Sequence, residues 1–206
     1  MTDPGPHLFW ITSRAAGTVA LVLSSLAVCL GLMMSGRRLR GRGPDLRAAH
    51  EAISLATLVA IGVHGGALLG DKFLHPSLAD IAVPFVSGYK TLWTTTGIVA
   101  AWATAALGLS YYARRWIGQQ RWRRLHSLTA VAWALGVLHS LGEGTDAGRL
   151  WFLAMVGIVV LPAAALVLAR ATQERSDPAQ QPRRERQSRG DSREPADEPE
   201  PLWVGR

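Results

Sequence analysis

The sequence contains a single cysteine, Cys29, and long stretches that contain no charged residue. One cysteine excludes an intrachain disulfide bond, so cysteine usage does not indicate a redox compartment. Over the first 170 residues, uncharged stretches of bilayer-spanning length recur, although the whole chain has a net charge of +7. A length of 206 residues would allow one soluble domain, but this distribution of charge argues against it.

Five uncharged stretches are candidates for membrane-spanning helices. A helix that crosses the hydrocarbon core needs about 20 predominantly apolar residues. The stretches that qualify are residues 15–36, 52–70, 91–113, 125–142 and 150–169. The sequence therefore predicts an all-α, polytopic membrane helix bundle. The first stretch is expected to be retained rather than cleaved, because no A-x-A site follows it and Arg14 is the only positive side chain before it.

Basic residues are concentrated in alternate loops between these stretches. The loop after the first stretch contains RRLRGRGPDLR and the loop after the third contains RRWIGQQRWRR, whereas the loops after the second and fourth have few basic residues. Positively charged loops face the cytoplasm, so the N-terminus is predicted outside and the C-terminus inside, in a cell (inner) membrane. Arginines placed in this way do not form one face of a folded domain, and nucleic-acid binding is not expected.

Composition divides the chain into three parts. Residues 1–14 are expected to form an extracytoplasmic segment and residues 15–171 the membrane domain. Residues 172–206 are rich in Pro, Arg and Glu, which predicts a disordered cytoplasmic tail. The long outer loop at residues 71–90 has an apolar centre, IAVPFVSGY, that is too short to cross the membrane. This centre is expected to lie at the interface or to cover the bundle.

Four of the six histidines form two pairs on two of the predicted spanning helices. His50 and His64 are 14 residues apart on the second, and His126 and His139 are 13 residues apart on the fourth, which gives rises of about 21 and 20 Å. Both helices run outward from the cytoplasm, so His50 and His126 share an inner level, and His64 and His139 an outer level. A bis-histidine haem needs one imidazole on each axial face, so the spacing predicts two haems stacked across the membrane.

The two spacings differ in helical phase. At about 100° per residue, 14 residues fall about 40° short of whole turns and 13 residues about 140° short. His126 and His139 would therefore not share a face of a straight helix. A kink, a local change of winding or a rotation of one haem relative to the other is expected to absorb the difference, and Gly136 is the candidate weak point.

Other interpretations of the histidines stay open. A single histidine in a span is as often a hydrogen-bonded packing residue, although intramembrane ionisable residues favour a functional role. Zinc or non-haem iron would need clustered ligands, and His50-Glu51 is not followed by a second histidine at a spacing of four. Haem-free ion or metal transport would favour carboxylates at the midplane, but the interiors of the spans contain no Asp or Glu.

Four segments carry a family resemblance over about residues 13–156: SRAAGTVALVL, HEAISLATLVAIGVHGGALLGD, VPFVSGYKTLW and RRWIGQQRWRRLHSLTAVAWALGVLHSLGEGTD. In these segments the chain resembles the ferric reductase-like transmembrane domain family. That family includes the membrane parts of ferric reductases and NADPH oxidases, and the haem-binding subunit of the bacterial methionine sulfoxide reductase system. The resemblance implies two haem b groups, with His50 and His126 as ligands of the inner iron and His64 and His139 as ligands of the outer iron.

The chain departs from the larger members of this family, many of which have a sixth span and a cytoplasmic flavin and nicotinamide domain. No G-x-G-x-x-G fingerprint follows a strand, so no flavin or NAD(P)H site is expected in this chain. Electrons are expected to come from a separate cytoplasmic flavoreductase or from membrane quinol. A periplasmic protein is one candidate acceptor.

Three further residues are candidates for contact with haem. Arg123 and Arg124 lie near the inner level and could hold haem propionates, although the positive-inside rule is the simpler explanation for them. Trp133 lies midway between His126 and His139 and could pack between the haems, although ordinary bundle packing explains it equally well.

The sequence thus predicts a di-haem b-type membrane cytochrome that moves electrons from the cytoplasmic side to an outer acceptor such as ferric iron. The nearest alternative is a non-catalytic, haem-binding electron-donor subunit of a periplasmic reductase complex. A haem-free ion or metal transport protein is the alternative from another class. If the chain is itself an enzyme, the expected class is a haem-dependent membrane oxidoreductase.

Overall fold

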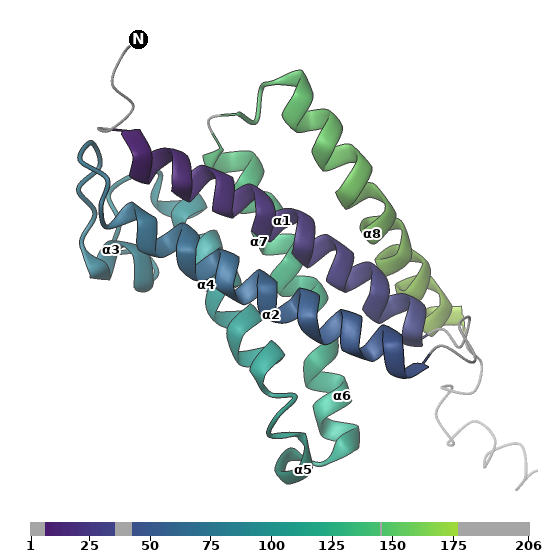
Figure 1. Cartoon of the computed structure of the whole chain (residues 1–206). Coiled ribbons are helices and arrows are strands. Elements are labelled where there is room, and N and C mark those ends of the chain that lie inside the picture. Colours follow the sequence, from purple (N-terminus) through teal and green to yellow (C-terminus); the bar gives the residue numbers. More distant parts are fainter. Residues whose placement is uncertain (1–6, 36–42, 145, 177–206) are drawn as a thin grey trace, which may run out of the picture. The chain divides into compact units, whose positions relative to one another are not determined.

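The computed structural model describes residues 7–35, 43–144 and 146–176. Every regular element in these residues is a helix (Figure 1). The helices are α1 (Leu8–Ser35), α2 (Gly43–Leu68), α3 (Leu78–Ala82), α4 (Thr91–Leu109), α5 (Arg114–Ile117), α6 (Gln119–Ser127), α7 (Thr129–Glu143) and α8 (Leu150–Ser176). The chain divides into two units, Met1–Arg170 and Ala171–Arg206. The first unit contains all of these helices except the last turns of α8, and the contacts below lie within it.

Five helical stretches are long and apolar enough to cross a membrane. They are Leu8–Ser35, Pro44–Leu68, Thr91–Leu109, Gln119–Glu143 and Leu150–Thr172. They coincide with the five predicted spans and confirm the all-α membrane bundle. Helices are expected here because the bilayer core offers no water to satisfy backbone polar groups. Large apolar side chains such as Ile158 and Leu161 are 75% and 67% exposed, which suits contact with lipid.

Two predicted boundaries differ from the structure. α1 begins at Leu8, so residues 8–14 continue the first membrane helix instead of forming a separate segment. α8 runs to Ser176, so the first residues of the predicted tail at 172–206 are helical. Both helices extend past these predicted ends because an established helix gains one hydrogen bond for each residue added, including polar ones. The remainder of the predicted tail, residues 177–206, lies outside the described residues.

The fourth span is divided at Leu128 into α6 and α7. The Leu128 amide bonds the Leu125 carbonyl at 3.0 Å, and the Val131 amide bonds the Leu128 carbonyl at 2.9 Å. These three-residue bonds wind the chain by about 20° more per residue than an α-helix does. They supply part of the rotation that a 13-residue spacing lacks. The predicted change of winding is therefore confirmed, but its predicted place at Gly136 is wrong, because Gly136 lies inside α7.

Two side-chain hydroxyls explain why the break occurs at Leu128. The Ser127 hydroxyl donates to the Arg124 carbonyl at 2.7 Å, and the Thr129 hydroxyl donates to the His126 carbonyl at 2.7 Å. Hydroxyls that bond a preceding turn offer the backbone an alternative to the α-helical ladder and often bend a helix. Because these two contacts lie on either side of Leu128, the ladder is interrupted there.

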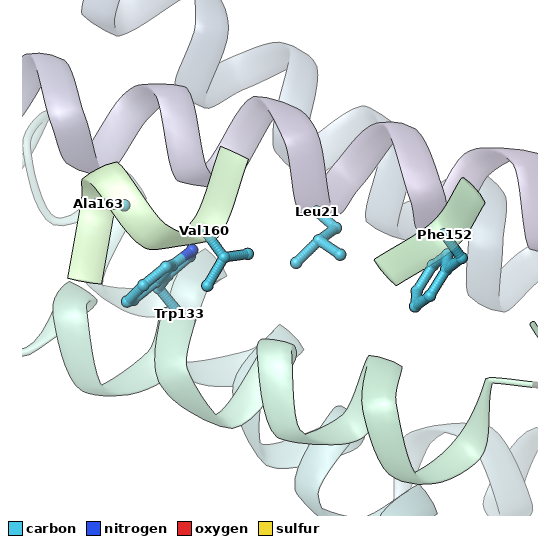
Figure 2. Close-up of a cluster of buried hydrophobic side chains, with 5 residues drawn as sticks. All are labelled: Leu21, Trp133, Phe152, Val160 and Ala163. Carbon is cyan, nitrogen blue, oxygen red and sulfur yellow. The ribbon is translucent and has the colours of Figure 1, made fainter. Parts of the chain in front are cut away.

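The helices pack as two pairs joined by contacts in the middle. α1 packs along α2, α4 packs along α7, and contacts between α1 and α7 join the pairs (Figure 1). α8 is attached through a cluster of buried apolar side chains (Figure 2), namely Leu21 of α1, Trp133 of α7, and Phe152, Val160 and Ala163 of α8. Leu21 and Trp133 thus connect α8 to both helix pairs.

The loop between α2 and α4, which is predicted to lie on the outer side, folds back along α4. It contains the short helix α3, which begins with a capping box. The Phe85 amide donates to the Thr95 hydroxyl at 3.0 Å, and the Trp102 indole donates to the Ala82 carbonyl at 2.8 Å. The apolar centre of this loop therefore contacts α4, and its placement at the membrane interface stays a prediction.

Ser25 provides a test of the contact between α1 and α7. Its hydroxyl donates to the Leu21 carbonyl at 2.8 Å and accepts from the Trp133 indole at 3.0 Å. Ser25→Ala leaves a buried indole N–H without its acceptor, so we expect the free energy of unfolding to fall by about 1–3 kcal/mol. The measurement is denaturant unfolding of the detergent-purified protein, followed by tryptophan fluorescence.

Ser24→Ala is the matched control for this prediction. The Ser24 hydroxyl donates to the same Leu21 carbonyl at 3.0 Å, but among the described residues it has no hydrogen bond to Trp133. The control is expected to lose little stability. Equal losses in the two variants would show that the indole contact does not stabilise the bundle.

Candidate functional site

The structure brings the four predicted histidines together in two pairs. His50 of α2 faces His126 of α6, with ring centres 6.2 Å apart and ring planes at 81°. His64 of α2 faces His139 of α7, with ring centres also 6.2 Å apart and ring planes at 71°. α2 therefore contributes one histidine to each pair, and the second histidine comes from either side of the break at Leu128.

The separation within each pair suits one metal ion between two rings. A metal–imidazole bond of about 2.0–2.1 Å, with about 1.1 Å from the nitrogen to the ring centre, places two such centres about 6.3 Å apart. The observed 6.2 Å agrees with this value in both pairs. A direct hydrogen bond between two ring nitrogens, at about 2.9 Å, would bring the centres to about 5.1 Å. Edge-to-face aromatic packing also covers this distance, so the partners of the ring nitrogens decide between the two interpretations.

In the pair formed by His64 and His139, called the outer pair after its predicted level, each Nδ1 bonds a backbone carbonyl of a neighbouring helix. His64 Nδ1 donates to the Ser13 carbonyl at 2.8 Å and lies 3.1 Å from the Ser13 hydroxyl, which itself donates to the His64 carbonyl at 2.9 Å. His139 Nδ1 donates to the Trp93 carbonyl at 2.9 Å. Because a carbonyl can only accept, Nδ1 carries the hydrogen and the neutral ring keeps its lone pair on Nε2. A metal-binding histidine is commonly fixed in this way by its other nitrogen.

The inner pair is held less tightly by the backbone. His126 Nδ1 lies 3.4 Å from the Leu107 carbonyl, at the long limit of a hydrogen bond. His50 Nδ1 is buried and has no hydrogen bond of acceptable geometry within the described residues.

Three glycines provide the space that these rings occupy. A Cβ atom at Gly17 or Gly97 would lie only 2.9 or 2.5 Å from Nδ1 of the outer histidine that it faces. A Cβ atom at Gly31 would lie 3.3 Å from the Cε1 atom of the inner histidine of α2. Gly17 and Gly31 are 14 residues apart on α1, which is the spacing of His50 and His64 on α2. Close approach of α1 to α2 and of α4 to α7 therefore depends on glycine at the level of three of the four rings.

His126 has an aromatic neighbour instead of a glycine. The Trp122 ring stacks on it, with centres 5.0 Å apart and planes at 25°. Tyr111 meets Trp122 edge-on at 5.9 Å, and the Arg114 guanidinium lies 3.9 Å from the centre of the Tyr111 ring. The indole nitrogen of Trp122 is buried and has no hydrogen-bond partner within the described residues.

The three other predicted site residues are not part of either pair. Arg123 and Arg124 are exposed on α6, and their guanidinium groups form no ion pair within the described residues. Trp133 is 8% exposed in the apolar cluster of Figure 2, and its indole donates to Ser25. Contact between these three residues and haem stays a prediction.

Each pair offers two protein ligands and no more. Within the described residues, no group of three or more His, Cys, Asp and Glu side chains could hold a metal ion. A structural or catalytic zinc site takes three or four protein ligands. Each pair therefore suits a metal ion whose other ligands come from a group that is not part of the protein.

Comparisons with protein-family models, curated proteins and solved structures found no match for this chain. The resemblance to the ferric reductase-like family therefore stays a prediction. Support for a function comes from the geometry of the paired histidines and their neighbours.

Ser13, the three glycines and Trp122 were not identified as site residues from the sequence. The glycines on α1 carried a usable signal, because their spacing of 14 repeats that of the histidines on α2. Ser13 and Trp122 carried no such signal. The role of Ser13 depends on a neighbouring helix, and the role of Trp122 depends on the buried surroundings of its indole nitrogen.

Gly97→Ala is expected to disrupt the outer pair. A Cβ atom 2.5 Å from His139 Nδ1 must displace the ring from the Trp93 carbonyl, and we expect the free energy of unfolding to fall by about 1–3 kcal/mol. Gly136→Ala is the control, because nothing lies within 4 Å of its added Cβ atom and helix propensity alone favours alanine by about 1 kcal/mol. Denaturant unfolding in detergent measures both. A Gly97→Ala variant as stable as Gly136→Ala would show that the ring does not need this space.

Proposed function

We propose that this protein is a di-haem b-type membrane cytochrome that moves electrons from the cytoplasmic side of a cell membrane to an acceptor at the outer face. His50 and His126 would hold the inner haem, and His64 and His139 the outer one. The observation that carries the proposal is the 6.2 Å separation of ring centres in both pairs. When bound, haem b would supply a one-electron carrier that takes two ligands from the protein, which is the number that each histidine pair offers.

The residues around the histidines prepare them for this role. Hydrogen bonds from Nδ1 to the carbonyls of Ser13 and Trp93 fix the ring orientation and leave Nε2 free to bind. They also raise the basicity of the imidazole as a ligand. The surrounding helices expose apolar side chains to lipid, and the interiors of the spans have no Asp or Glu. Ions and water are thereby excluded from a region through which only electrons need to pass.

The proposed direction of transfer depends on the orientation of the chain. The arginine-rich loops after the first and third spans favour the cytoplasmic side, which places the pair formed by His50 and His126 inward. A separate flavoreductase or membrane quinol would then donate electrons at this level. Ferric iron or a periplasmic protein would accept them near the outer pair.

The orientation can be tested with reporters fused to the C-terminus of the chain. Green fluorescent protein at this position is expected to fluoresce, and alkaline phosphatase at the same position is expected to be inactive, because the C-terminus is proposed to be cytoplasmic. The reverse pattern would invert the proposed direction of electron transfer and leave the haem assignment unaffected.

The haem assignment is tested by a reduced-minus-oxidised absorbance spectrum and a pyridine haemochrome count on the detergent-purified protein. We expect low-spin b-type bands and about two haems per chain, because each histidine pair completes one iron. His139→Ala is expected to remove the outer haem and leave the inner one, and His126→Ala to do the reverse. Both single variants should block transfer across the membrane.

His75→Ala is the control for these variants, because His75 lies in the outer loop and in neither pair. Electron paramagnetic resonance of the ferric protein gives a second readout. Ring planes at 81° and 71° predict the highly anisotropic low-spin signal of near-perpendicular axial imidazoles. If the wild-type protein contained no haem after expression with ample haem, the proposal would be contradicted.

A further inference from the structure

The indole nitrogen of Trp122 is a buried donor without an acceptor. It has no hydrogen-bond partner within the described residues, whereas the indoles of Trp102 and Trp133 donate to Ala82 and Ser25 at 2.8 and 3.0 Å. Leaving a buried donor unpaired costs about 1–3 kcal/mol. Buried polar groups in native proteins almost always have a partner, so the partner of Trp122 is expected to be a group other than these side chains and backbone atoms.

Trp122 lies beside the inner histidine pair. It precedes His126 by four residues on α6, which places both on one face of the helix. Its ring is nearly parallel to the His126 imidazole, with centres 5.0 Å apart and planes at 25°. On the proposed orientation it lies one helical turn closer to the cytoplasm than His126. The acceptor that the Trp122 indole lacks is therefore expected to belong to the group that His50 and His126 bind, or to lie next to that group.

The chemistry of the missing acceptor is restricted by the local sequence. Residues 110–128 contain no Asp or Glu. The nearby Glu51 carboxylate of α2 accepts from the Tyr112 hydroxyl at 2.8 Å and has no hydrogen bond to the Trp122 indole. The propionates are the charged groups of haem b, and a carboxylate that leaves water needs donors in compensation. Arg124 lies about 160° around α6 from His126, and the side chains of both Arg123 and Arg124 are exposed. The Trp122 indole N–H is a buried donor beside this pair that has no acceptor within the described residues.

We propose that the Trp122 indole N–H donates a hydrogen bond to a propionate carboxylate of the haem held by His50 and His126. This inference rests on the proposed function and adds a haem-binding residue to it. Trp122 then has two roles, because its ring supports the His126 imidazole by stacking while its nitrogen neutralises part of the propionate charge. The Arg114 guanidinium stacks on Tyr111, and Tyr111 contacts Trp122. Arg114 thus adds positive charge near the proposed propionate.

Trp122→Phe separates the two roles, since phenylalanine keeps an aromatic ring for stacking and removes the N–H. We expect two haems per chain to remain. Without the donor, the propionate charge is less neutralised and favours ferric iron, so the midpoint potential of the inner haem should fall. A fivefold change in the ferric-to-ferrous ratio corresponds to about 40 mV for a one-electron couple. The outer haem should not shift.

The measurement is a spectropotentiometric titration of the purified full chain, repeated in the His139→Ala background, which isolates the inner haem. Resonance Raman spectra of the same samples report the propionate bending mode. This mode responds to the hydrogen bond on the propionate, whereas a loss of protein stability alone does not change it. Trp116→Phe is the matched control, because Trp116 is in the same cytoplasmic segment and is 76% exposed. It should change neither the potential nor the bending mode.

Three outcomes would overturn the inference. Trp122→Phe could match Trp116→Phe in both readouts, the shift could appear in the outer haem, or the potential could move while the propionate mode stays unchanged. The first would assign the indole to another acceptor, such as a lipid phosphate. Loss of haem from the wild-type protein would instead contradict the proposed function, so the two failures are distinguishable.

Discussion

An imidazole placed among apolar helices requires hydrogen-bond partners to offset its removal from water, and the arrangement of the helices around the outer pair depends on this requirement. In the outer pair, Nδ1 of each ring is satisfied by a carbonyl of the helix that packs alongside. A backbone carbonyl can reach the ring only if the two helices approach closely. Gly17 and Gly97 permit this approach, since a Cβ atom at either would collide with the ring. The pairing of α1 with α2 and of α4 with α7 therefore follows from where the histidines lie.

The same requirement explains why the fourth span is not one straight helix. α2 presents His50 and His64 with a phase difference of only about 40°, so both rings can point to the same neighbour. A straight helix would turn His126 and His139 apart. The tighter winding at Leu128 lets the two parts of this span, α6 and α7, each aim a histidine at α2.

The sequence predicted the number of spans, the all-helical class and the members of each histidine pair, because hydrophobic length and residue spacing are local properties. It placed the change of winding at Gly136, since a glycine weakens a helix in isolation. The structure places it where hydroxyls of Ser127 and Thr129 bond the preceding turn, which is a competition that composition does not reveal. The helix ends were also missed, because they depend on cooperative helix growth. The hydrogen bonds between Ser13 and His64 were missed because they depend on contact with another helix.

The two pairs differ in the hydrogen bonds that hold their rings. The outer rings are fixed by short bonds of 2.8 and 2.9 Å to backbone carbonyls, which draw electron density toward the ligand and favour ferric iron. In the inner pair, His126 Nδ1 has one bond of 3.4 Å and His50 Nδ1 has none to the described part of the chain, and Trp122 stacks on His126. On ligand basicity alone, an inner haem would hold an electron more readily than an outer one. Outward transfer would then require a strongly reducing donor or removal of electrons by the acceptor, so the partners would set the direction of net flow.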